Sequence, residues 1–222
     1  MSGEPARRPL QSRGKPWAAA LARRLTTWRV APNFISALSV VFAGAAGACL
    51  PLAVRAASPA AAALLFLATA AGIQLRLLAN LMDGMVAVEG GLGSKTGELW
   101  NDLPDRFADA LVFAGAAYAQ PGSAWGVELG WAAAVLAVIT AYVRVLGAAA
   151  GAGQHFLGPM AKQQRMATMT AACVLGAALA LAGRAALAAH VLTAALALVV
   201  AGAAVTIARR LLTIAGALNA RA

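Results

Sequence analysis

Long apolar stretches alternate with short polar segments along most of the chain. About six of them approach the roughly 20 apolar residues that a helix needs to cross a bilayer. The pattern therefore predicts an all-α integral membrane protein with about six transmembrane helices. The third stretch is short unless its helix begins near Gly97, in which case it carries acidic residues to the membrane boundary. The expected spans are Phe34–Val54, Ala60–Met82, Ala108–Gln120, Trp125–Gly147, Thr168–Gly183 and Ala186–Ala208.

The composition excludes an ordinary soluble domain. Of the 222 residues, 61% are hydrophobic and only 12% are charged, whereas soluble domains carry about 25% charged residues. The formal net charge is +10, which in a soluble protein would suit binding to nucleic acid. No soluble domain is apparent that could display such a patch, so we expect no nucleic-acid partner.

The positive charges predict the orientation in the membrane. Lys and Arg are frequent in the N-terminal segment, in alternate loops and in the C-terminal tail, whereas the opposite loops hold little beyond Arg55 and Arg184. The positive-inside rule then places both termini in the cytoplasm, which agrees with an even number of spans. We expect the protein in a bacterial inner membrane.

The first thirty residues differ from the rest. The segment Trp17–Val30 sets apolar side chains beside arginines, which favours an amphipathic helix on the anionic cytoplasmic surface. An ordinary positive flank of the first span would explain the same pattern, and both interpretations stay open. We therefore divide the chain into a cytoplasmic tail with this helix, residues 1–30, and a six-helix membrane domain, residues 31–222.

Most carboxylates of the chain lie in one short segment. Ionisable groups at membrane depth are costly and usually functional. Crowded carboxylates repel one another, and hard divalent cations relieve this repulsion by binding their oxygens. A solvated loop explains Glu89 better, but Asp83 and Asp105 each adjoin an apolar span. Six of the eight acidic residues lie in this segment: Asp83, Glu89, Glu98, Asp102, Asp105 and Asp109.

The spacing within this segment places polar residues on shared helix faces. Residues three or four positions apart lie on one face of a helix, and this spacing occurs at the end of the second span and the start of the third. Small residues between them let a bulky ligand approach the backbone. The sequence thus predicts two helix ends that hold oxygen ligands around metal ions and a diphosphate. The polar residues are Asn80, Asp83, Asn101 and Asp105, and the small residues are Gly84, Ala87 and Gly97.

From Asn80 to Asp105 the sequence resembles the signature of the CDP-alcohol phosphotransferases, Asp-x2-Asp-Gly-x2-Ala-Arg-x8-Gly-x3-Asp-x3-Asp. Every gap is preserved, and Ala31–Ser36 is similar to the Pro-Asn-x-Ile-Thr element that precedes the first span in this family. Asn80 and Asn101 replace two aspartates and Val88 replaces the arginine. Asparagine offers an oxygen without a charge, so we expect weaker metal binding unless Glu98, Asp102 and Asp109 compensate. The identical positions are Asp83, Gly84, Ala87, Gly97 and Asp105.

The resemblance implies a membrane transferase of phospholipid biosynthesis. It would move a phosphatidyl or related phospho-alcohol group from a CDP-alcohol such as CDP-diacylglycerol to an acceptor hydroxyl, with release of CMP. Asp105 would take the proton from the acceptor, and the family commonly forms homodimers. Mg²⁺ or Mn²⁺ would bind through Asn80, Asp83, Asn101 and Asp105, and the CDP moiety would lie against Gly84, Ala87 and Gly97.

Basic residues of the second half would complete the site. By the same resemblance, Arg144, Lys162 and Arg165 would receive a small polar acceptor, in some members a phosphorylated one, and arginine forms a bidentate fork with phosphate. Lys162 and Arg165 could instead be positive-inside anchors. Arg76 could be a counter-ion of the acidic segment or could extend to the membrane surface.

Two alternatives to the enzyme remain. A pseudoenzyme of the same fold with a binding or scaffolding role would explain the replaced aspartates. A small transporter would carry broken helices and charges near the bilayer centre. The charges here lie at helix ends, which favours the enzyme.

Overall fold

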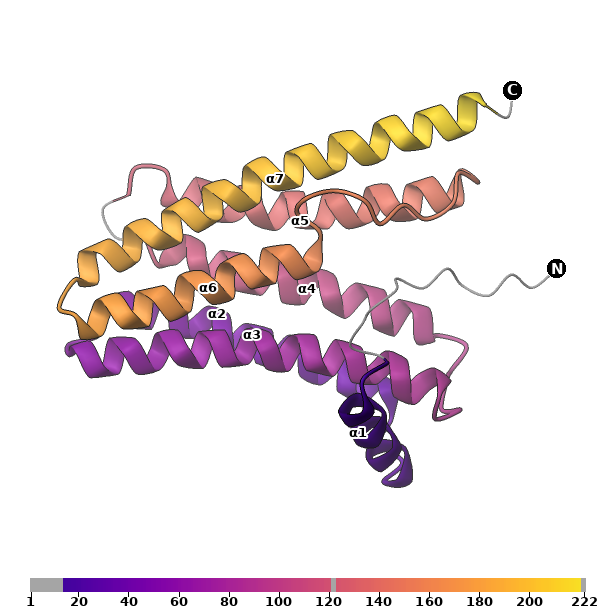
Figure 1. Cartoon of the computed structure of the whole chain (residues 1–222), viewed down its shortest axis with the longest axis horizontal. Helices are drawn as coiled ribbons and strands as arrows, with labels where there is room; N and C mark the ends of the chain where they lie inside the picture. Colours follow the sequence, from indigo (N-terminus) through magenta and orange to yellow (C-terminus); the bar gives the residue numbers. More distant parts are fainter. Residues whose placement is uncertain (1–13, 121–122, 221–222) are drawn as a thin grey trace.

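The computed structural model describes residues 14–120 and 123–220, which form helices connected by short loops and contain no strand. Figure 1 shows the long helices running side by side along one direction, with the short first helix lying across them. The predicted all-α class is confirmed. The helices are α1 (Pro16–Thr27), α2 (Pro32–Val54), α3 (Pro59–Val88), α4 (Gly97–Tyr118), α5 (Gly126–Ala149), α6 (Lys162–Leu181) and α7 (Ala185–Asn219).

Five of these helices are long and apolar enough to cross a membrane, which is consistent with a helical membrane protein. They are α2, α3, α5, α6 and α7. The remaining long helix, α4, begins at Gly97, which is the earlier start that the sequence left open. It falls outside the apolar group because it carries four charged residues, Asp102, Asp105, Arg106 and Asp109, toward its N-terminal end. The short third span is therefore the apolar half of a longer helix whose other half is polar.

The six long helices close into a ring. Within it, α2 contacts α3 and α4, α4 packs on α5, α5 and α6 both pack on α7, and α3 packs on α6. Side chains such as Phe66, Phe113 and Leu192 fill the core. Successive helices joined by short loops run antiparallel, so α3 and α5 end where α2, α4 and α6 begin. The acidic segment lies at this end of the bundle.

Glycines bring α2 and α4 into close contact. A Cβ atom on Gly115 would collide with the carbonyl oxygen of Gly47, and a Cβ on Gly47 would collide with the carbonyl oxygen of Leu111. Lipid tails are as apolar as the side chains, so helices in a membrane associate through close packing rather than the hydrophobic effect. The small residues that dominate the apolar spans permit this packing.

The short helix α1 packs on the end of α3. Ala18 and Ala22 are buried in one cluster with Met82 and Val86, whereas the indole ring of Trp28 is exposed and stacks with the guanidinium of Arg24, 4.9 Å away. The predicted helix is thus present with one buried face. Its position at the membrane surface remains a prediction, and residues 1–13 of the predicted tail lie outside the described residues.

Candidate functional site

Buried and half-buried charged side chains gather where α3 ends and α4 and α6 begin. Two of them, Asp83 and Asp105, belong to the signature, with 3% and 9% of their surface exposed. Charged groups inside a protein are nearly always paired, because an unpaired buried charge is strongly destabilising. We call these residues the charge cluster: Arg76, Asp83, Asp105, Asp109, Lys162 and Arg165.

Asp83 is held by the start of α2. The hydroxyl of Ser36 donates to Asp83 Oδ2 at 2.6 Å, and the backbone N–H of Gly84 donates to Oδ1 at 2.5 Å. Ser36 is buried and belongs to the element that precedes the first span. The sequence pattern identified that element but did not assign Ser36 to the site. The structure shows that the two signature elements, 47 positions apart, are in direct contact.

Asp105 is the meeting point of three helices. Lys162 Nζ, at the start of α6, lies 2.5 Å from Asp105 Oδ2. The side-chain amide of Asn80, on α3, donates to Oδ1, and Arg76 Nη2 lies 3.6 Å from the same oxygen. Asp83 is near enough for its charge to interact with those of Asp105 and Lys162. Sequence-predicted residues from both halves of the chain therefore come together here.

Asp109 lies one turn further along α4 and is paired with two arginines. Arg76 Nη2 is 2.5 Å from Oδ1 and Arg165 Nη2 is 2.6 Å from Oδ2. Arg165 also donates to the carbonyl oxygen of Met160 at 3.1 Å. Of the two interpretations of Arg76, the counter-ion is therefore the one observed. Arg165, expected to contact the acceptor, is turned toward Asp109 instead.

A second, more exposed ion-pair network lies beside the cluster. Asp102 Oδ1 accepts from Arg106 at 2.6 Å and from Arg144 at 2.8 Å, and 45% of the Asp102 side chain is exposed. Arg144 also donates to Gln154 Oε1 at 2.8 Å and lies 5.5 Å from the ring centre of Phe156. These contacts position the Arg144 guanidinium at the same end of the bundle as Asp105.

The other predicted site residues line the same region without entering the charge cluster. Asn101 is exposed on α4, and Gly84 is buried, whereas Ala87 and Gly97 are half-buried. Val88, which replaces the signature arginine, is 54% exposed. The side chain of Glu98, which the sequence offered as a compensating acid, lies outside the described part of the chain.

The oxygen donors suit a single hard cation that is shared with a substrate. Among the described residues, no three His, Cys, Asp or Glu side chains are grouped to hold a metal. Asp83 and Asp105 would supply two carboxylates, and Asn80 and Asn101 would supply amide oxygens. Mg²⁺ is usually bound by one or two carboxylates together with substrate phosphates and water. The donor set fits that arrangement, whereas it is too small for a cage made by the protein alone.

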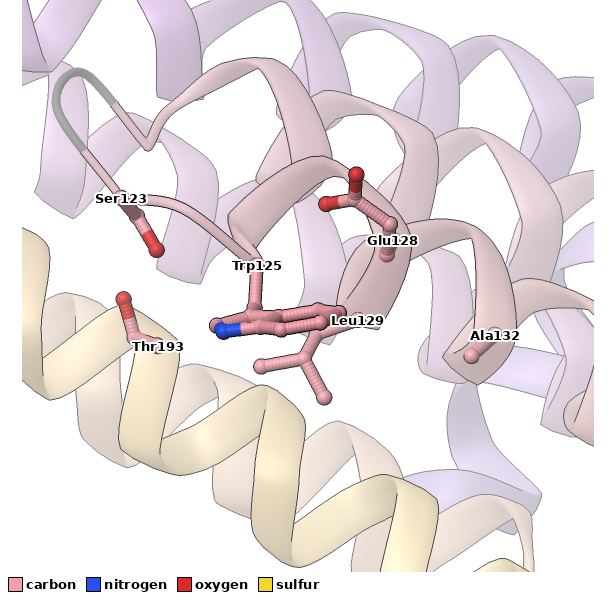
Figure 2. A pocket seen from close by; sticks show the side chains of 6 residues that line it. All are labelled: Ser123, Trp125, Glu128, Leu129, Ala132 and Thr193. Carbon is pink, nitrogen blue, oxygen red and sulfur yellow. The ribbon is translucent and has the colours of Figure 1, made fainter.

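A pocket at the other end of the bundle is apolar. It is an open pocket of about 480 Å³ near the starts of α5 and α7. Figure 2 shows the indole of Trp125 and the side chain of Leu129 on its wall, with the hydroxyls of Ser123 and Thr193 turned toward each other. The length of α5 separates this pocket from Arg144. It therefore takes no part in the chemistry of the charge cluster.

Similarity to other proteins is found at the level of structure. No protein-family model matches the sequence, and no curated protein matches it. The structure is similar to Mycobacterium tuberculosis phosphatidylinositol phosphate synthase (PgsA1) with CDP-DAG bound, with a TM-score of 0.68 and 18% identity over 89% of this chain and 92% of that one. For the same enzyme in complex with manganese and citrate, the TM-score is 0.68 and the identity is 18%, over 89% of this chain and 88% of that one. For its apo form, the TM-score is 0.64 and the identity is 18%, over 88% of this chain and 94% of that one. These similarities confirm the fold that the signature implies.

Proposed function

We propose that this chain is a CDP-alcohol phosphotransferase of phospholipid biosynthesis. It would transfer a phosphatidyl or related phospho-alcohol group from a CDP-alcohol lipid to an acceptor hydroxyl and release CMP. The observation that carries the proposal is the convergence of Asp83, Asp105 and Lys162, from three helices, at one end of a membrane bundle. The similar fold of an enzyme solved with CDP-DAG supports a lipid-linked donor.

Asp105 is the proposed general base. A base must lie within hydrogen-bond reach of the proton that it takes. Lys162 holds one oxygen of Asp105 and Asn80 holds the other, which fixes the carboxylate in place. Asp105 takes the proton of the acceptor hydroxyl while the hydroxyl oxygen attacks the phosphorus next to the lipid alcohol. The bond from this phosphorus to the CMP oxygen then breaks, and CMP carries away the electron pair.

The signature residues would bind the donor and its cation. A divalent cation, Mg²⁺ or Mn²⁺, would neutralise the diphosphate oxygens and the leaving group when bound, and the manganese complex of the similar enzyme supports this choice. Gly84, Ala87 and Gly97 would leave room for the CDP moiety against the backbone. The oxygen ligands would be Asn80, Asp83, Asn101 and Asp105.

Arg144 and Lys162 would bind the acceptor. The guanidinium of Arg144 is held by Asp102 and Gln154, and a positioned guanidinium binds a phosphate or another anionic group through two parallel hydrogen bonds. An acceptor that carries phosphate therefore suits this site. Arg165 as a third acceptor contact remains a prediction. We further propose that both termini face the cytoplasm of a bacterial inner membrane and that the protein is a homodimer.

A non-catalytic protein of the same fold is the second candidate. The observation that favours it is that both oxygens of Asp105 are already engaged, by Lys162 and Asn80. Such a protein would bind a CDP-alcohol without releasing CMP.

The decisive experiment measures CMP release from CDP-diacylglycerol by the purified full chain in detergent. Acceptors should include glycerol phosphate, inositol, inositol phosphate and serine, each with Mg²⁺, with Mn²⁺ and with a chelator. We expect release that depends on one acceptor and on the cation, and that is lost in Asp105→Asn but kept in Glu128→Gln, an exposed acid at the other end of the bundle. Donor binding without CMP release under every condition would support the non-catalytic alternative.

A further inference from the structure

Arg76 is an arginine buried inside the bundle, on the helix face that carries the signature residues. It lies one turn before Asn80 and two turns before Asp83 on α3, so the three side chains share one face. Its side chain is 0% exposed. One guanidinium nitrogen, Nη2, lies 2.5 Å from Asp109 and 3.6 Å from Asp105. A single cation therefore contacts both acids of α4 that face α3.

We infer that Arg76 is a positioning residue that acts as a permanent counter-ion of the site. It holds Asp105 and Asp109 in place and weakens the binding of a free divalent cation, so that the cation binds well only together with a diphosphate. This inference rests on the proposed function. The observation that supports it is the charge balance of the cluster.

The charges of the buried cluster cancel without any bound ion. Three acids supply −3 and three bases supply +3, a sum of zero, which is the balance that burial requires. A divalent cation alone would bring the sum to +2, whereas a cation together with a diphosphate, itself negatively charged, would bring it back toward zero. The acids are Asp83, Asp105 and Asp109, and the bases are Arg76, Lys162 and Arg165.

Two substitutions separate this role from a purely structural one. Arg76→Gln and Asp109→Asn break the same ion pair, so a structural role would change cation binding in the same direction in both. As a counter-ion, Arg76 repels a divalent cation at Asp105, and its removal should tighten binding. Removing Asp109 leaves an excess positive charge, which should weaken binding. Opposite shifts in cation affinity would therefore identify Arg76 as a counter-ion.

The test is a titration of the full chain in detergent with Mn²⁺ alone, followed by the electron paramagnetic resonance signal of free Mn²⁺. Arg76→Gln should bind Mn²⁺ about tenfold more tightly or better, and Asp109→Asn about tenfold more weakly or worse. Arg76→Lys keeps the charge and should stay near the wild type, as should the double variant Arg76→Gln/Asp109→Asn. Arg55→Gln removes an exposed charge at the other end of α2 and is the matched control.

An Arg76→Gln variant that folds but binds Mn²⁺ no more tightly than the wild type would overturn the inference. If that variant does not fold, Asp109→Asn with unchanged or tighter binding would do the same. If neither single variant folds, the Mn²⁺ affinity of the double variant must stay within about tenfold of the wild-type affinity, and a larger change would overturn the inference. Absence of Mn²⁺ binding in every variant would also overturn it. No substrate enters this titration, so failure of CMP release would refute the proposed reaction and leave the opposite shifts intact.

Discussion

Asp105→Asn is the substitution that tests the proposed base most directly. The amide has the shape of the carboxylate, but it cannot take a proton at neutral pH and carries no negative charge for an ion pair. In the structure it would face Lys162 Nζ, now 2.5 Å away, and Arg76 Nη2, now 3.6 Å away. The change should therefore lower both the catalytic rate and the stability of the fold.

The expected losses in catalytic rate and in stability can each be given a magnitude. A positioned general base contributes about 10²–10⁴-fold to the rate, so kcat should fall by at least about a hundredfold. Breaking a fully buried ion pair costs about 3–5 kcal/mol. Arg76 keeps Asp109 as a partner, and 23% of the Lys162 side chain remains exposed. We therefore expect a smaller loss in the free energy of unfolding, about 1–3 kcal/mol.

The assay combines the rate of CMP release with thermal unfolding of the same detergent-solubilised sample. Glu128→Gln, which also removes one carboxylate, should change neither quantity. A folded Asp105→Asn protein that keeps more than about a tenth of the wild-type kcat would refute the assignment of the base, since general-base catalysis is worth more than that. A fall in stability without a fall in kcat would leave Asp105 a structural role only.

Three further predictions follow from the contacts. Arg144→Ala should raise the KM for the acceptor far more than the KM for the donor, and unchanged acceptor kinetics would assign Arg144 to structure. Gly115→Leu should lower the unfolding temperature strongly or prevent folding, because its side chain would meet the backbone of Gly47; a stable, monodisperse variant would contradict this packing. Reporter fusions at Ser123 and after Ala222 should report opposite sides of the membrane, because three helices, α5, α6 and α7, lie between them. Two reporters on the same side would contradict the proposed orientation.

The sequence by itself determined the class of the protein and the approximate positions of its helices, although α7 extends to Asn219, beyond the expected end at Ala208. In lipid every backbone polar group must be satisfied within the chain, so an apolar stretch of about 20 residues has little choice but to form a helix. The spacing of Asn80, Asp83 and Asp105 also predicted which residues share a helix face, because helical periodicity is a local property. Hydropathy was less informative for α4, whose polar first turns hid its start at Gly97.

Only the tertiary structure decided which charge faces which. Partners in the site lie far apart in the chain, 47 positions for Ser36 with Asp83 and 57 positions for Asp105 with Lys162, and they meet because six helices close into a ring. Sequence alone left both Arg76 and Arg165 between two interpretations, whereas packing brought both to Asp109. Burial is the physical reason: inside the bundle an arginine must find an acid, and the choice of acid depends on which helices are neighbours.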